Sequence, residues 1–194
     1  MVYKISAYII LIVFYGCFFI KKQSQKKKGI KTNHIGEAKE GLVKLIETAM
    51  GTASVVIVIT EMVSIFLGTS GFPVYIRFIG IILASLGDAV FICAVLTMRD
   101  SWRAGVSKND KTELVTEGIY KWSRNPAFLG FDLVYTGIAL AFFNSVLLAV
   151  TIITMILFHL QIVNVEEEFL INTFGQSYLD YRKKVCRYFG RKAK

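Results

Sequence analysis

The sequence predicts an all-α membrane protein, a polytopic bundle of about five transmembrane helices. Apolar residues make up 54% of its 194 residues, whereas only 19% are charged. The charged residues stand in blocks between long apolar stretches, which is typical of chains that cross a bilayer several times. The net charge of +9 belongs to those blocks and not to a basic face of a soluble domain, so we expect no nucleic-acid partner. The same pattern excludes a disordered, collagen-like or disulfide-stapled chain.

Three stretches are apolar and long enough to cross a hydrocarbon core of roughly 30 Å, which takes about 20 helical residues. They are Val2 to Ile20, Leu45 to Leu67 and Phe72 to Met98. The first has no early basic region and no small-residue cleavage pattern, so we expect a retained span and not a removed signal peptide. The three cysteines, Cys17, Cys93 and Cys186, are an odd number at wide intervals, which predicts neither a disulfide framework nor a metal site.

A fourth apolar stretch covers residues 128–165 and carries one charge, Asp132. Asn144 and Ser145 interrupt it near its middle, which predicts two short antiparallel helices joined by a tight turn. A pair of helices that stops short of the far membrane face is the alternative. We expect the whole chain, 1–194, to form one domain, in which residues 1–98 supply the first three spans with a basic loop and residues 99–194 carry the chemistry.

The lysines and arginines predict the orientation in the membrane. With five spans and the N-terminus outside or in the lumen, only Lys4 and Arg77 of the 23 basic residues lie on the outer side. By the positive-inside rule, the C-terminus and the polar segments 21–44, 99–127 and 166–194 are then cytoplasmic. The basic block within the first of these segments is interpreted as a flank that fixes topology, with binding of anionic headgroups as the alternative.

The polar segment before the fourth stretch, residues 114–130, is dense in glycine, proline and aromatic residues. Gly118 permits a backbone conformation with positive φ, which other residues rarely adopt. Pro126 biases Asn125 toward an extended conformation directly before the apolar stretch. We therefore expect this loop to present polar backbone at the membrane surface.

The polar segment after the fifth predicted span begins with three adjacent carboxylates, Glu166, Glu167 and Glu168. On a helix they point about 100° apart, so one or two of them can face a common site. Further on, Tyr178 and Tyr181 with the following basic run predict an amphipathic helix that lies on lipid headgroups. Closure of this helix over a cofactor is the alternative.

These two segments together resemble the isoprenylcysteine carboxyl methyltransferases and their wider integral-membrane relatives, which include phospholipid N-methyltransferases. The residues that carry the resemblance are Leu-Val-Thr-x-Gly-x-Tyr at 114–120, Trp122, Arg-x-Pro-x-x-x-Gly at 124–130, Glu-Glu at 166–167 and Phe-Gly-x-x-Tyr-x-x-Tyr at 174–181. The resemblance extends from Leu114 to about Phe189. Two positions depart from the family, since Asn125 and Phe128 stand where it usually has His and Tyr.

The resemblance implies an enzyme that uses S-adenosyl-L-methionine, bound in a cytoplasmic pocket, to methylate the carboxylate of a lipophilic prenylcysteine in the membrane. It implies Arg124 and Glu167 as the catalytic residues, and the Arg124 guanidinium suits a carboxylate. No metal is implied. The cofactor contacts that the resemblance implies are Val115, Tyr120, Asn125, Pro126, Ala127, Phe128 and Glu166.

The choice of methyl acceptor follows from elementary acid–base chemistry. An α-carboxyl has a pKa of roughly 3.5, so it is already ionised and needs no general base. A lipid amine must first lose a proton, which Asn125 cannot accept as a histidine would. Phospholipid ethanolamine N-methylation stays as a second hypothesis, and a non-catalytic polybasic membrane adaptor as a third. For a lipid substrate, the fourth and fifth spans with Asp132, His159 and Gln161 are the expected wall of a tunnel.

Overall fold

The computed structural model describes residues 1–35, 40–105 and 112–192. Within these ranges the ordered elements are helices, and the only β-type pairings are two isolated bridges. Two of the short elements, η1 and η2, are 3-10 turns, and η3 is a π-helical turn. The helices are α1 Val2–Lys27, α2 Gly41–Leu67, α3 Val74–Met98, η1 Arg99–Ser101, η2 Gly118–Lys121, α4 Pro126–Ala141, α5 Ser145–Gln161, η3 Ile162–Glu166, α6 Glu167–Phe174 and α7 Gln176–Lys184.

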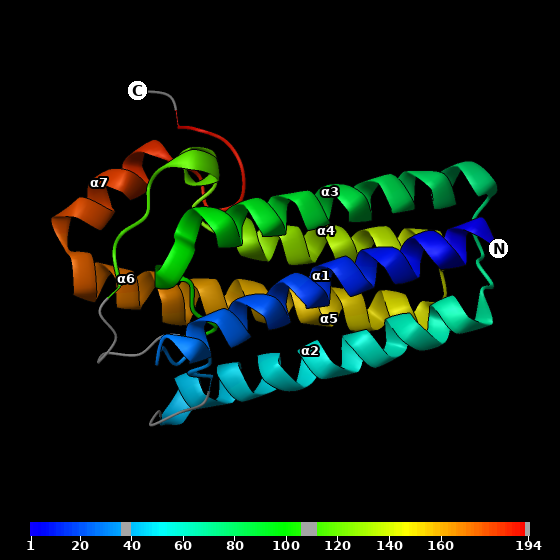
Figure 1. Ribbon diagram of the computed structural model, residues 1–194, viewed down its shortest axis with the longest axis horizontal. Coiled ribbons are helices and arrows are strands. Elements are labelled where there is room, and N and C mark those ends of the chain that lie inside the picture. Colours follow the sequence, from blue (N-terminus) through cyan, green and yellow to red (C-terminus); the bar gives the residue numbers. More distant parts are fainter. Residues whose placement is uncertain (36–39, 106–111, 193–194) are drawn as a thin grey trace.

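The five longest helices lie side by side along the long axis of the molecule (Figure 1). Helix α4 is apolar, but its 16 residues rise only about 24 Å, less than the hydrocarbon core of a bilayer. The prediction of about five membrane helices is confirmed, with α4 as a short member. Among the described residues, four helical stretches are long and apolar enough to cross a membrane: Val2–Lys27, Gly41–Leu67, Val74–Ser101 and Ser145–Phe174.

The two ends of the bundle carry different parts of the chain. One end holds the N-terminus and the connections α2–α3 and α4–α5, and the other holds α6, α7 and the segments that follow α1 and α3 (Figure 1). The last turn of α1 and the segment after it are both joined to the segment after α3, because the Gln25 amide of α1 donates to the Trp102 carbonyl at 2.8 Å and the Ala104 N–H donates to the Thr32 carbonyl at 2.9 Å. The polar segments that the sequence groups on one side of the membrane therefore share one end of the bundle.

Helices α3 and α4 approach each other at backbone contact distance, because glycines line their interface. A Cβ atom on Gly137 would lie 2.5 Å from both the Ala84 nitrogen and the Gly80 carbonyl oxygen. A Cβ atom on Gly87 would lie 2.7 Å from the Val134 nitrogen. Small residues at such positions are what allow membrane helices to pack closely. This contact fixes α4, whose first residue follows the loop that carries the sequence motif.

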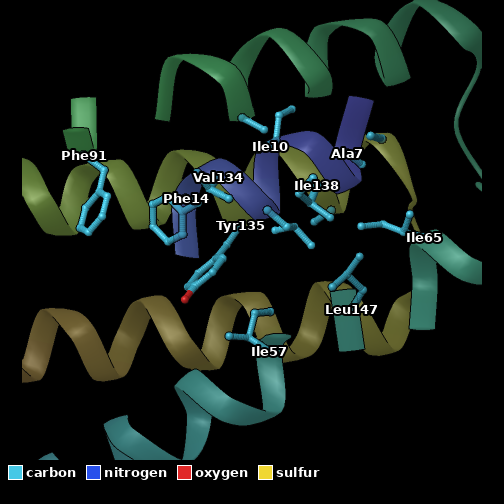
Figure 2. Packing of buried hydrophobic residues seen from close by; sticks show 14 of the residues in the cluster. Ala7, Ile10, Phe14, Ile57, Ile65, Phe91, Val134, Tyr135, Ile138 and Leu147 are labelled. Atoms are coloured by element: carbon cyan, nitrogen blue, oxygen red, sulfur yellow. The ribbon is translucent and has the colours of Figure 1, made fainter. Parts of the chain in front are cut away.

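An aromatic cluster joins α1 to this helix pair. The ring centroid of Phe14 on α1 lies 4.6 Å from that of Phe91 on α3 and 4.7 Å from that of Phe131 on α4. Figure 2 shows Phe14 close to Val134 and Tyr135 of α4. Aromatic pairs at these separations contribute about 0.5–1.5 kcal/mol beyond their buried area. Helix α1 is therefore held against α3 and α4 by interdigitated rings.

The turn between α4 and α5 lies where the sequence predicts it. Helix α4 ends at Ala141 and α5 begins at Ser145. The Asn144 side chain caps α5, since its Oδ1 accepts a hydrogen bond from the Leu147 N–H at 2.9 Å. Its Nδ2 donates to the Ser64 hydroxyl of α2, also at 2.9 Å. The polar break in the apolar stretch therefore starts one helix and ties it to another.

We expect Gly137→Ala to destabilise the protein, because the added methyl group forces α3 and α4 apart. Overpacking of this kind costs about 1–3 kcal/mol. Gly16→Ala is the matched control, since a Cβ atom at Gly16 of α1 meets no other segment within 4 Å and alanine favours helix formation. Thermal unfolding in detergent should give a lower midpoint for Gly137→Ala and an unchanged or higher midpoint for Gly16→Ala. Equal midpoints for the two variants would contradict the close helix contact.

Candidate active site

The loop that precedes α4, residues 114–125, is shaped by a glycine and a proline; we call it the motif loop. Gly118 begins η2 with a φ of +55°, which L side chains rarely adopt. Pro126 is the first residue of α4, where its missing N–H removes no helical hydrogen bond. Arg124 and Asn125, directly before it, are buried. The chain therefore enters α4 with two polar side chains turned into the protein.

The three adjacent glutamates take three different environments. Helix α5 passes through the π-helical turn η3 before α6 begins at Glu167. Such a turn shifts the side-chain register of a helix and recurs at functional sites. Glu167 is only 4% exposed, Glu166 is half-buried and Glu168 is exposed. Glu167 is therefore the carboxylate that the fold turns inward.

Arg124 and Glu167 form a buried ion pair together with a third residue, Arg187. The Arg124 Nη2 lies 3.0 Å from the Glu167 Oε1, and both side chains are almost fully buried. Arg187 donates from Nε to Oε1 at 2.9 Å and from Nη2 to Oε2 at 3.1 Å, which is a bidentate contact. This hydrogen bonding raises the pKa of Arg187. Two guanidinium groups thus surround one carboxylate; we call this the ion cluster.

Two tyrosines of α7 complete the surroundings of the ion cluster. Arg124 donates from Nη1 to the Tyr178 hydroxyl at 2.8 Å. The Tyr181 hydroxyl donates to the Tyr120 carbonyl at 2.7 Å, and burial raises the pKa of Tyr181, so it stays protonated. Tyr178 is 1% exposed and Tyr181 is 9% exposed. The prediction that these rings lie on lipid headgroups is therefore wrong, because both face the motif loop.

The segment after α7, residues 185–191, lies across the motif loop; we call it the strap. The Arg124 N–H donates to the Cys186 carbonyl at 3.1 Å, and the Asn125 Nδ2 donates to the Arg187 carbonyl at 3.1 Å. The Gly190 N–H donates to the Trp122 carbonyl at 2.7 Å. Sequence reasoning missed this strap and the role of Arg187, because a backbone pairing across more than 60 residues leaves no local pattern.

The other residues that the sequence singles out lie outside the ion cluster. Burial, Tyr181 and the nearby Glu166 carboxylate raise the pKa of Tyr120, so Glu166 lies within electrostatic reach of that ring. The Phe128 ring packs against Phe158 of α5, with centroids 5.3 Å apart. Pro126 is buried in the first turn of α4, whereas Val115 and Ala127 are half-buried.

The ion cluster retains one unused donor. The Arg124 Nε is buried and has no hydrogen-bond partner among the residues that the structure describes. A buried polar group without a partner costs about 1–3 kcal/mol, so a ligand that supplies an acceptor there is favoured. With two positive groups against one negative group, the ion cluster suits an additional anion, such as a carboxylate.

A groove of about 420 Å³ opens beside the strap, between α3, α4 and α5. The Tyr188 hydroxyl at its edge is 2.7 Å from the Nδ1 of His159. Gln161, by contrast, is fully buried and donates to Glu47 of α2 at 3.4 Å, so its predicted place in a lipid tunnel wall is wrong. The groove is lined by Leu83, Leu129, Asp132, Leu133, Thr136, Met155 and Tyr188.

The fold and the site define a multi-pass α-helical membrane protein with a buried, positively charged cluster beside an apolar groove. Residues 75–177 match the model of the phospholipid methyltransferase family. Because this match covers more than half of the chain, the protein belongs to that family.

Several curated relatives carry the name protein-S-isoprenylcysteine O-methyltransferase. The chain is 32% identical to the Xenopus laevis protein over 113 residues, which is 57% of this chain and 39% of that protein. It is 32% identical to the Saccharomyces cerevisiae protein over 109 residues, 55% of this chain and 46% of that protein. With the Schizosaccharomyces pombe protein it shares 38% over 80 residues, 41% and 34% of the two chains. The matches span less than half the length of these relatives.

We expect Glu167→Gln to destabilise the fold, because it leaves two guanidinium groups without their counter-charge. Breaking a buried ion pair by removing one partner costs about 3–5 kcal/mol. Glu168→Gln is the matched control, since Glu168 is the exposed neighbour. Chemical unfolding followed by tryptophan fluorescence should separate the two variants clearly. A Glu167→Gln protein as stable as the control would show that the ion cluster contributes nothing to the fold.

Proposed function

We propose that this protein transfers a methyl group from S-adenosyl-L-methionine to the C-terminal carboxylate of a prenylated cysteine, or of a similar lipophilic acid, at the cytoplasmic membrane face. The observation that carries the proposal is the ion cluster, in which Arg124 keeps an unused donor beside Glu167. An apolar groove adjoins the strap that contributes Arg187. The names of the curated relatives support the same reaction.

The residues around the ion cluster fit a cofactor that carries a carboxylate, an ammonium group, a sulfonium and an adenine. The half-buried Glu166 suits the cationic ammonium group of this cofactor, whereas the unused Arg124 donor stays free for the acceptor carboxylate. Aromatic faces attract a sulfonium through cation–π interaction. When bound, S-adenosyl-L-methionine would supply an electrophilic methyl group. The residues proposed to hold it are Val115, Tyr120, Asn125, Pro126, Ala127, Phe128 and Glu166.

The proposed reaction requires the protein to align the reacting groups and to stabilise their charges. It requires no general base. An ionised carboxylate can attack directly, so Asn125 in place of a titrating residue is no obstacle. Arg124 would orient the acceptor carboxylate, and Glu167 holds Arg124 in place through the 3.0 Å ion pair. Correct alignment alone contributes about 7–11 kcal/mol to such displacements. The net positive charge of the ion cluster also favours an acidic acceptor over an amine.

Two access routes follow from this proposal. The apolar groove between α3, α4 and α5 would admit the lipid chain from the bilayer. The cofactor would arrive from the water on the side of the bundle that holds α6 and α7. The excess of lysine and arginine at this end supports a cytoplasmic location for it.

A second candidate function, N-methylation of an ethanolamine lipid, is favoured by one observation. Asp132 lines the groove, and its Oδ1 is buried with no hydrogen-bond partner in the described part of the chain. A carboxylate in that position attracts an ammonium group. The description of the matched family, phospholipid methyltransferase, points in the same direction.

Cofactor binding is the first test of the proposed function. Protein purified in detergent should bind S-adenosylhomocysteine in isothermal titration calorimetry, because that product retains every recognition group except the transferred methyl. Adenosine, which lacks the amino-acid part, should bind at least tenfold more weakly, because Glu166 is proposed to contact that part. The absence of heat at high micromolar S-adenosylhomocysteine would remove the enzymatic proposal.

The second test follows the label from radioactive S-adenosylmethionine into lipid products. We expect N-acetyl-S-farnesylcysteine to be methylated and phosphatidylethanolamine not. Arg124→Lys should lower kcat/KM about 100-fold or more, because it removes the fork of donors that orients the acceptor. Lys121→Arg, a change of an exposed cation on the same loop, should have no effect. Label found only in phosphatidylethanolamine would establish the second candidate instead.

A further inference from the structure

The groove beside the ion cluster contains a single charged side chain among its lining residues. Leucine and methionine side chains of α3, α4 and α5 make most of its wall, and Asp132 of α4 interrupts them. A carboxylate is expensive in an apolar groove that faces a membrane, and such residues commonly mark a functional site. The Asp132 carboxylate therefore needs a hydrogen-bond donor or a cation as its partner.

Asp132 is also the groove residue whose hydrogen bonding is incomplete. Its Oδ1 is buried and has no partner in the described part of the chain. The other polar groups of the wall are satisfied, since the Thr136 hydroxyl contacts the Met155 sulfur at 3.7 Å and the Tyr188 hydroxyl contacts His159 at 2.7 Å. The groove thus offers one unused acceptor to a ligand.

The strap connects this acceptor with the ion cluster. Tyr188 lines the groove and directly follows Arg187, which holds Glu167. Burial and the Asp132 carboxylate raise the pKa of Tyr188, whereas Arg187 lowers it, so this one hydroxyl senses both the groove and the ion cluster. A ligand that reaches both places would carry an acidic group for the ion cluster, an N–H donor for Asp132 and an apolar chain for the groove.

We propose that Asp132 is a specificity-determining residue that accepts a hydrogen bond from the amide N–H of an N-acylated prenylcysteine. The inference rests on the proposed function, because it assumes that Arg124 orients the carboxylate of the same molecule. In an N-acylated cysteine, the carboxylate and the amide nitrogen are attached to the same carbon atom. The groove volume of about 420 Å³ falls in the lower range for one small ligand, which suits a single prenyl chain better than the two acyl chains of a phospholipid.

The test compares two compounds that differ in the amide alone. N-acetyl-S-farnesylcysteine carries the N–H, and S-farnesyl mercaptopropionate has hydrogen in place of the acetylamino group. The full-length protein in nanodiscs is assayed for kcat/KM and, separately, for binding of each compound by thermophoresis. A hydrogen bond to a charged group should give wild-type protein a preference of roughly tenfold or more for the amide compound.

Asp132→Leu should abolish this preference while leaving the mercaptopropionate values within twofold. Asp88→Leu is the matched control, since Asp88 is another intramembrane carboxylate with an unpartnered buried oxygen but does not line the groove. It should retain the full preference. Should Asp132→Leu fail to fold, Asp132→Asn supplies the answer, because an uncharged amide oxygen is a weaker acceptor and should reduce the preference severalfold.

Wild-type protein without a preference, or an Asp132 variant that keeps it in full, would overturn the inference. Equal turnover and equal binding of both compounds would leave the proposed function standing and refute the role of Asp132. Tighter binding of the amide compound without methylation of either one would refute the proposed function and retain the role of Asp132. Methylation of phosphatidylethanolamine, with neither compound bound, would refute both.

Discussion

The ion cluster of Arg124, Glu167 and Arg187 is the interaction on which the arrangement of this site depends. It joins three segments that are far apart in the sequence: the motif loop, the start of α6 and the strap after α7. Desolvating such charges costs several kcal/mol each, and the cost is offset only when hydrogen bonds satisfy the groups. Glu167 is satisfied by both arginines, whereas Arg124 keeps one N–H unused. The ion cluster therefore holds three segments together and still has a donor for an anionic ligand.

The membrane helices determine where this ion cluster forms. The glycine interface brings α3 and α4 into backbone contact, which fixes the point at which the motif loop enters α4. On the other side, α5 continues through a π-helical turn into α6 and carries Glu167 inward. Helix α7 then returns over the loop, and Tyr178 and Tyr181 hold Arg124 and the backbone of Tyr120. Close helix packing and polar chemistry are thus parts of one structure, with the apolar groove opening beside them.

Hydropathy was enough to predict the spans and the hairpin, because the bilayer imposes a length and a polarity on every crossing helix. It could not predict that α1 continues to Lys27, since a helix need not end where its apolar residues do. The tyrosines of α7 were misassigned because an amphipathic pattern identifies a buried face but not the surface that covers it. Arg187 escaped notice because its contacts with Glu167 depend on folding of the strap, which has no local sequence signature.

The most direct measurement of the central claim is an experimental structure of the protein with S-adenosylhomocysteine in a lipid nanodisc. The account predicts density for the ligand between the motif loop and the start of α6, with its amino-acid part near Glu166 and with Glu167 still paired to an arginine. A ligand bound at any other part of the bundle, or a Glu167 carboxylate separated from both arginines in the complex, would contradict it.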